Sequence, residues 1–300
     1  MTVPVNISVL VPVYNVEPYL VQCLESICSQ TLRELEVVCV DDASTDGSLS
    51  ILREFAERDP RVKVVQAPEN GGLSRSRNLA MNHAVGEYLF LVDSDDWLET
   101  DLLEEMYSRA KALDADKLVC GFRYYYEADP GREDRFMPED MAPPEKGWLP
   151  CTPETIGKIH HGAGGMMIRR SIVEKHGIRF PEGVACEDLY FHYAVFPWCR
   201  RVCVVSRAAY VYRKRAGSIT SDFASGSSLQ SLDYLTVAEA GAEGMERSRN
   251  SGGIQDGIFE NAGNGREEHP QIRPSCRSKG GYPEGGRYAL SGKSVPSRRG

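Results

Sequence analysis

The chain has 300 residues, of which 41% are hydrophobic and 26% are charged. This balance is that of a globular protein, so it excludes a collagen-like, a wholly disordered or a membrane-embedded chain. The 35 Lys and Arg residues against 43 Asp and Glu residues give a net charge of -8. Nucleic acid is therefore not expected as a partner, because neutralising its phosphates requires a concentrated basic face.

The first hundred residues alternate short apolar runs with segments of helical period, which is the pattern of parallel strands joined by crossover helices. Pro18 suits the first turn of a helix, and Asp46 and Ser48 are good caps for the next one. The predicted elements, in chain order, are a strand at 7–11, a helix at Pro18, a strand at 35–40, a helix at Ser48, a strand at 62–65, a helix at 74–84, a strand at 88–92, a helix at 100–113 and a strand at 117–122. The sequence therefore predicts an α/β fold.

Beyond these elements the pattern is less regular. Residues 127–150 are rich in charge and proline, which predicts a long loop or mobile flap. Apolar runs return between 151 and 220, but this block is too short and mixed for an independent domain. A short helix is expected at 223–240. Residues 241–300 contain 13 Gly and only 6 Leu, Ile, Val or Phe, too little apolar surface to offset the entropy of ordering, so this glycine-rich tail is expected to be disordered.

Nine cysteines are scattered along the chain without a C-x-x-C pair, and most lie in apolar runs. They are typical of reduced thiols in a cytoplasmic protein. The N-terminus lacks the basic start of a signal peptide, and no stretch approaches the ~18 apolar residues that a spanning helix needs. We therefore expect a cytoplasmic location.

Three acidic clusters lie after predicted strands or before a predicted helix, and ligands bind at the carboxyl ends of strands in open α/β sheets. Residues 41–47 follow the second strand. A turn with a helix cap accounts for part of this cluster, but not readily for the adjacent Asp41 and Asp42, whose carboxylates repel each other. Residues 93–96 place three carboxylates within four positions. That is a hard oxygen site suited to Mg²⁺ or Mn²⁺, whereas an acidic helix start accounts for only part of it.

The third cluster is Glu187-Asp188, which precedes an amphipathic segment. A carboxylate at such a junction could be a general base or a helix cap, and the residues alone favour the cap. The sequence contains no P-loop, nucleophile elbow, H-E-x-x-H motif or dinucleotide-binding glycine fingerprint after the first strand.

Five motifs together resemble those of family 2 glycosyltransferases, which have the nucleotide-sugar-binding fold called GT-A. They occur in the family's order at 11–15, 26–31, 40–48, 70–72 and 93–96. The resemblance covers about residues 5–220 and implies a Rossmann-like mixed sheet flanked by helices. It implies one domain over 1–222, with a nucleotide-sugar-binding half at about 5–115 and an acceptor-binding half at 116–222.

The resemblance implies donor-binding roles at the strand ends. Tyr14 would lie against the nucleotide base, and Asp42, helped by Asp41, would accept a hydrogen bond from that base. The other residues implied to bind the donor are Pro12, Asn15, Arg77, Asp93, Asp95, Arg213 and Arg215. Arg213 and Arg215 would reach the diphosphate.

The resemblance also implies the chemistry. Asp95 and Asp96 would hold Mn²⁺ or Mg²⁺, and Asp188, beside Glu187, would deprotonate the acceptor hydroxyl. The expected activity is metal-dependent, inverting transfer from a nucleotide-diphosphate sugar to a glycan or lipid-linked acceptor, in cell-surface polysaccharide synthesis. Peripheral association with the inner face of the membrane is part of this expectation.

Three alternatives stay open. A sugar nucleotidyltransferase would need a glycine-rich basic loop after the first strand, where residues 13–17 have neither glycine nor a cation. A receiver-like signalling module would need a lone Asp after the third strand, where the chain has Ala67-Pro68-Glu69. An inactive, truncated transferase would bind the donor without turnover.

Overall fold

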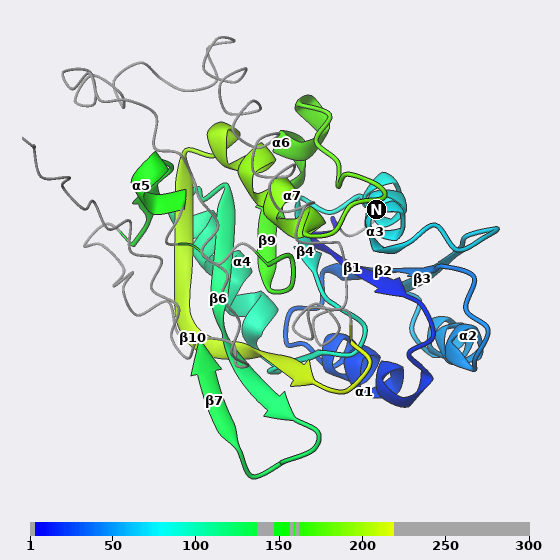
Figure 1. Ribbon diagram of the computed structural model, residues 1–300. Coiled ribbons are helices and arrows are strands. Elements are labelled where there is room, and N and C mark those ends of the chain that lie inside the picture. The colour runs from blue at the N-terminus through cyan, green and yellow to red at the C-terminus, as the bar shows by residue number, and fades with distance from the viewer. Residues whose placement is uncertain (1–3, 137–146, 157–158, 160–161, 219–300) are drawn as a thin grey trace, which may run out of the picture.

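The computed structural model describes residues 4–136, 147–156, 159 and 162–218 (Figure 1). The predicted helix at 223–240 and the tail at 241–300 lie outside these residues. The first half of the described chain contains β1 (Ile7–Val13), α1 (Glu17–Cys28), β2 (Leu35–Asp41), α2 (Ser48–Arg58), β3 (Val62–Gln66), α3 (Leu73–His83) and β4 (Tyr88–Leu91). Each corresponds to a predicted element.

The second half is more fragmented. It contains β5 (Trp97–Leu98), α4 (Leu102–Leu113), β6 (Lys117–Tyr126), β7 (Glu133–Phe136), β8 (Leu149–Pro150), α5 (Pro153–Ile156), β9 (Met166–Arg169), α6 (Arg170–Lys175), α7 (Glu187–Val195), the 3₁₀ turn η2 (Phe196–Trp198) and β10 (Arg201–Lys214).

The strands of the described residues belong to one mixed sheet with the order β3-β2-β1-β4-β9-β6-β10-β5, to which β7 is added beside β6 and β8 beside β10. The first four strands are parallel, as the alternation of strands and helices predicts. Strand β9 then inserts antiparallel between β4 and β6, and β6 pairs in parallel with β10. The second apolar block therefore completes the sheet begun by the first.

The sheet is covered on both faces, which explains why β1 and β2 are buried along their whole length and read as continuous apolar runs. One hydrophobic cluster joins the sheet to α1, α2 and α4. A second joins the other face to α3, α6 and α7. Figure 1 shows α1 and α2 below the sheet and α3, α6 and α7 above it.

The predicted loop at 127–150 is wrong for residues 149–150, which form β8 and pair with β10, and for residues 133–136. Residues 133–136 form β7, which pairs antiparallel with β6. The reason is that β6 continues to Tyr126, beyond its predicted end, and Phe136 of β7 packs against Phe122 of β6 with ring centres 6.3 Å apart. Residues 137–146 lie outside the part of the chain that is described.

The predicted caps of α2 separate into two roles. Asp46 accepts the N–H of Ser48 at 2.9 Å, as a residue at a helix start does. Ser48 is the first residue of the helix, and its hydroxyl instead accepts the N–H of Val16 at 3.0 Å. The Ser48 side chain, which the sequence predicts to cap α2, therefore binds the loop after β1.

Candidate functional site

The loop after β1 is joined to the loop after β2 by hydrogen bonds. The backbone N–H of Thr45 donates to Asn15 Oδ1 at 2.8 Å, and the N–H of Glu17 donates to Asp46 at 3.0 Å. Asn15 adopts a left-handed backbone, with φ of 50°, which asparagine tolerates better than most residues. This joint leaves the Tyr14 side chain 48% exposed at the end of β1, whereas Pro12 is buried within the strand.

The adjacent Asp41 and Asp42 face different surroundings. Asp42 accepts the backbone N–H of Gly71 at 2.9 Å and that of Gly72 at 2.7 Å, one on each carboxylate oxygen. Gly72 has φ of 84°, a conformation that favours glycine. Asp42 therefore fixes the turn from which α3 begins. Asp41 is fully buried, and its Oδ2 has no hydrogen-bond partner in the described chain.

Residues 93–96, which follow β4, are called the acidic turn. Asp96 is its last residue. It is 2% exposed, and its two oxygens accept the Tyr210 hydroxyl at 2.7 Å and the N–H of Arg213 at 2.8 Å. Burial, followed by the charges of Asp93 and Asp95, holds the pKa of Asp96 well above its ordinary range. These contacts anchor β10 to the turn and do not support Asp96 as the direct metal ligand that the resemblance implies.

Asp93 and Asp95 are more accessible, with side chains 30% and 19% exposed. Arg77 contacts one oxygen of Asp93 at 2.8 Å, and Arg215 contacts one oxygen of Asp95 at 2.8 Å. Each arginine thus contacts a single oxygen of its carboxylate. Burial and the neighbouring Asp93 charge raise the pKa of Asp95, and Arg215 opposes this increase.

These two carboxylates fit a divalent ion that also binds a diphosphate. In the described ranges no three His, Cys, Asp or Glu side chains group as a metal site made of protein alone. Mg²⁺ and similar ions commonly take one or two protein carboxylates and complete their shell with substrate phosphates and water. The donor set therefore suits a shared ion, with Asp95 and Asp93 as its protein ligands.

Arg213 and Arg215, which the sequence groups together, differ in the structure. Arg213 is 8% exposed, donates to the carbonyl of Asp95 at 2.8 Å, and stacks within 5.4 Å of the rings of Tyr19, Trp97 and Tyr125. These contacts hold Arg213 against the acidic turn, so it has less access to a diphosphate than the resemblance implies. Arg215 pairs with the Asp95 carboxylate itself.

The Glu187-Asp188 pair opens α7, after Cys186 in the left-handed region with φ of 60°. Glu187 accepts Arg77 Nη1 at 2.7 Å. Asp188 accepts the N–H of Leu189 on Oδ1, at 2.8 Å. Burial raises the pKa of Asp188 above its ordinary value, although the positive charge of Arg77 opposes this.

Two residues of this site were missed by sequence reasoning. The Tyr210 hydroxyl, besides donating to Asp96, accepts the N–H of Asp93 at 3.1 Å. A Cβ on Gly164 would lie 2.8 Å from that hydroxyl and 3.5 Å from Asp93 Oδ2, so glycine is required there. Tyr210 looks like any aromatic residue of a strand, and nothing local distinguishes Gly164.

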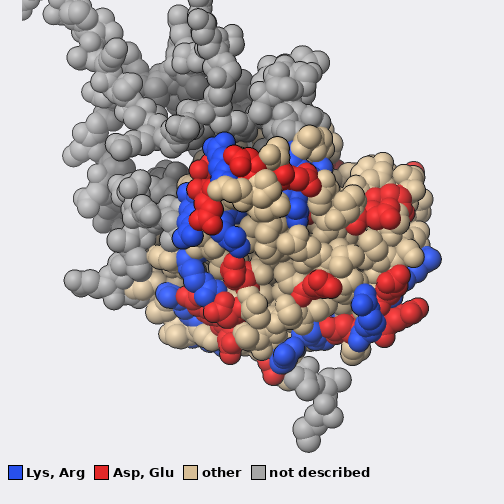
Figure 2. All heavy atoms as spheres, turned by 90° about the horizontal axis from the view of Figure 1, so that it is seen from below, with Lys and Arg blue, Asp and Glu red and all other residues tan. Residues whose placement is uncertain are grey.

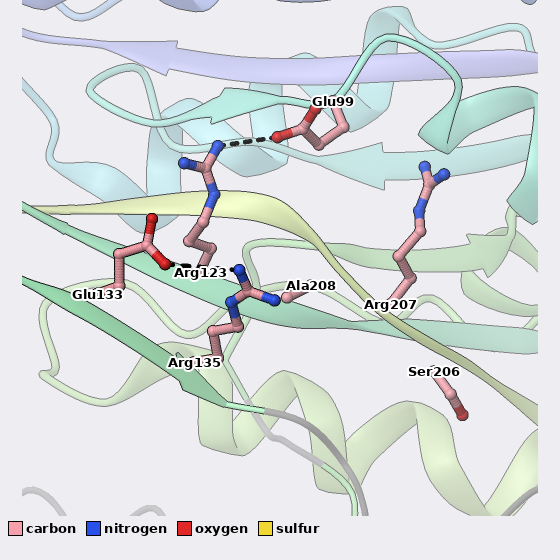
Figure 3. Close-up of a pocket in the computed structure, with 7 residues that line it drawn as sticks. All are labelled: Glu99, Arg123, Glu133, Arg135, Ser206, Arg207 and Ala208. Atoms are coloured by element: carbon pink, nitrogen blue, oxygen red, sulfur yellow. Dashed lines mark hydrogen bonds and ion pairs between the residues drawn. The ribbon is translucent and has the colours of Figure 1, made fainter.

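A charged hollow of about 530 Å³ lies elsewhere, beside the bend of β10. Figure 3 shows two of its arginines beside acids of the same hollow: Arg123 contacts Glu99 at 2.8 Å and Arg135 contacts Glu133 at 3.6 Å. On the face seen in Figure 2, basic and acidic side chains are likewise interspersed. Because each arginine of the hollow is already paired with an acid, including Arg207 with Asp101, we place the candidate site at the acidic turn instead.

Comparison with protein families gives a match to the model of "Glycosyl transferase family 2" over residues 8–177. Glycosyltransferase GlyA of Streptococcus pneumoniae is 35% identical over 228 residues, covering 73% of this chain and 32% of the relative. Putative glycosyltransferase EpsH of Bacillus subtilis is 34% identical over 225 residues, covering 72% of this chain and 63% of the relative. The chain thus spans from about a third to just under two thirds of the length of these curated relatives.

A third relative is the poly(ribitol-phosphate) beta-N-acetylglucosaminyltransferase TarS of Staphylococcus aureus. It is 32% identical over 216 residues, which are 70% of this chain and 36% of the relative. The crystal structure of its residues 1-349 with UDP-GlcNAc matches this chain with a TM-score of 0.62 and 26% identity, covering 82% of this chain and 74% of the other. No helix in the described residues is both long and apolar enough to cross a membrane.

Proposed function

The chain belongs to glycosyl transferase family 2, and from this premise we propose that it transfers a sugar from a nucleotide-diphosphate donor to an acceptor hydroxyl. One observation carries this proposal. The Arg77 guanidinium bridges Asp93, after β4, and Glu187, which opens α7, at 2.8 and 2.7 Å. The acidic turn suited to a metal-diphosphate and the carboxylates suited to proton transfer are therefore neighbours, although they lie almost a hundred residues apart in the chain.

The proposed donor is a UDP-sugar, because the TarS structures with a similar fold are complexes with UDP-GlcNAc and UDP. Asp95 and Asp93 would hold Mn²⁺ or Mg²⁺ together with the diphosphate. When bound, that ion supplies the positive charge that neutralises the leaving group. Tyr14, exposed just after β1, is proposed to lie against the base, and Arg215, just after β10, is proposed to reach the diphosphate.

Asp188 is the proposed general base. It would take the proton of the acceptor hydroxyl on Oδ2 as the hydroxyl oxygen bonds to the anomeric carbon and the bond to the UDP oxygen breaks. Direct displacement of this kind inverts the anomeric configuration. Burial raises the pKa of Asp188, which makes its carboxylate a stronger base than an exposed one.

The acceptor is proposed to be a glycan or a polyol-phosphate polymer of the cell surface. Two relatives support this class, since their names describe transfer to poly(ribitol-phosphate). We further propose that the protein acts in the cytoplasm, at the inner face of the membrane. No disulfide joins any two of the eight described cysteines, which suits such a reducing compartment, and cell fractionation checks the location.

Calorimetric titration with UDP and with GDP, each with and without Mn²⁺, tests the donor site. We expect UDP to bind only with the metal and GDP to bind at least tenfold more weakly. Release of UDP from UDP-N-acetylglucosamine, with water or a wall-polymer fragment as acceptor, then tests transfer. Binding of neither nucleotide contradicts the proposal, and donor binding without UDP release from any UDP-sugar identifies a binding-only protein.

A further inference from the structure

Arg77 is a buried guanidinium between two carboxylates of distant elements. It lies on α3, is 3% exposed, and donates from Nη2 to Asp93 and from Nη1 to Glu187. Burial alone would lower the pKa of Arg77, but the two carboxylates outweigh burial and raise it. The side chain is therefore charged, and both of its terminal nitrogens donate to protein carboxylates.

The surroundings of Arg77 fix α3 to the segment that leads into α7. The guanidinium lies over the ring of Phe180 at 5.1 Å, and that ring stacks on Phe191 of α7 with centres 4.1 Å apart. The next residue on α3, Asn78, donates to the carbonyl of Phe180 at 2.9 Å and accepts its N–H at 2.8 Å. One helix thus holds the end of β4 on one side and the start of α7 on the other.

The same helix begins at the turn that Asp42 fixes through the amides of Gly71 and Gly72. A continuous set of contacts therefore runs from the end of β2 through α3 to Glu187 and the adjacent Asp188. Arginine suits the junction because its planar fork donates in two directions at once. A lysine carries the same charge but only a single ammonium, which cannot occupy both positions.

We propose that Arg77 is a positioning residue, which sets Asp188 against the acidic turn by holding Asp93 and Glu187 together, and that it does not contact the donor. This inference rests on the proposed function. It differs from the donor-binding role that the resemblance implies, and the two roles predict different kinetics.

Arg77→Lys tests the proposal, with the UDP-sugar that the wild type turns over and Mn²⁺. If Arg77 positions Asp188, kcat falls about 100-fold, as small misplacements of catalytic groups do, while the Kd for UDP changes less than threefold. A tenfold or larger increase in this Kd, or a kcat within threefold of the wild type, overturns the proposal. Arg207→Gln is the control, because its ion pair with Asp101 lies outside the site; we expect both constants to stay unchanged.

A second variant covers the case in which Arg77→Lys does not fold. Glu187→Gln keeps the shape of the side chain and the contact of Arg77 with Asp93, and it weakens only the contact with α7. We expect a decrease in kcat of about tenfold or more with unchanged Kd for UDP. Unchanged kcat in a folded Glu187→Gln variant contradicts the proposal.

A double-mutant cycle separates positioning from general damage. If Arg77 acts through Asp188, then Arg77→Lys changes the residual rate of Asp188→Asn by less than threefold. A further 100-fold loss in that background shows independent action and overturns the proposal. Failure of the proposed function is distinct, because it appears as a wild type that neither binds UDP nor releases it.

Discussion

The two halves of the sheet differ in how far apart in the chain their functional contacts are. In the parallel half, the joints behind the donor site connect residues about 30 positions apart, such as Asp42 with Gly72. In the mixed half, the contacts that complete the site connect residues more than a hundred positions apart, such as Asp96 with Tyr210 and Asp95 with Arg215. The parallel half builds its loops locally, whereas the chemistry depends on β10 and α7 returning to the end of β4.

The largest expected effect falls on the mixed half. Asp188→Asn keeps the size of the side chain but removes the proton acceptor, so we expect UDP release to decrease about 1000-fold, within the range for loss of a general base. The Kd for UDP with Mn²⁺ should stay within threefold, because Asp188 is not among the proposed donor-binding residues. Wild-type turnover by this variant would show that Asp188 only caps α7.

The acidic turn lies where the two halves meet, and we expect substitutions of its neighbouring aspartates to have different effects. Asp95→Asn removes a proposed metal ligand, and we expect Mn²⁺-dependent UDP affinity to decrease about 100-fold. Asp96→Asn should instead reduce the free energy of unfolding by about 1–3 kcal/mol, since an amide nitrogen cannot accept the Arg213 N–H or the Tyr210 hydroxyl. Calorimetry measures the metal-dependent affinity of both variants, and urea unfolding measures their stability. Equal losses of metal-dependent affinity in both variants would support Asp96 as a metal ligand.

The pH dependence sharpens the comparison without a mutation. Burial raises the pKa of Asp188 above its ordinary value of 3.8. We therefore expect the carboxylate to become protonated, and kcat to fall, as the pH decreases through this raised pKa. Each pH unit below this pKa costs about tenfold in kcat. The pH profile of kcat at saturating UDP-sugar and Mn²⁺ measures this decrease, and a midpoint at or below pH 3.8 contradicts the assignment.

The smallest expected effect concerns the joint between the halves. Tyr210→Phe removes the hydroxyl that donates to Asp96 and accepts the N–H of Asp93. Leaving these buried groups unpaired should lower the free energy of unfolding by about 1–3 kcal/mol, with the fold retained. Urea unfolding measures it. Tyr107→Phe is the matched control, because the Tyr107 hydroxyl contacts Asn6 outside the site. An equal loss of stability in both variants would show that the Tyr210 hydroxyl contributes no more than any other tyrosine hydroxyl.

The sequence by itself determined the elements of the parallel half and the position of its acidic clusters. The strands there are continuous apolar runs, the helices have an apolar stripe, Asp41 is the last residue of β2, and Asp93 comes two residues after β4. These signals are local, because a strand buried on both faces needs apolar residues throughout. The resemblance in five motifs then supplied the family, which the comparison with the family model confirms.

Only the tertiary structure decided what each charged side chain faces. Asp95 and Asp96 are adjacent and identical in type, yet one is accessible and the other accepts two hydrogen bonds beneath the turn. Arg213 and Arg215 differ in a similar way, because Arg213 is buried against the turn and Arg215 contacts the Asp95 carboxylate. The sequence could not separate these pairs, because their partners lie on β10 and on the acidic turn, 114 to 120 positions apart. Burial and hydrogen bonding at such a distance are set by how the whole sheet closes and not by local pattern.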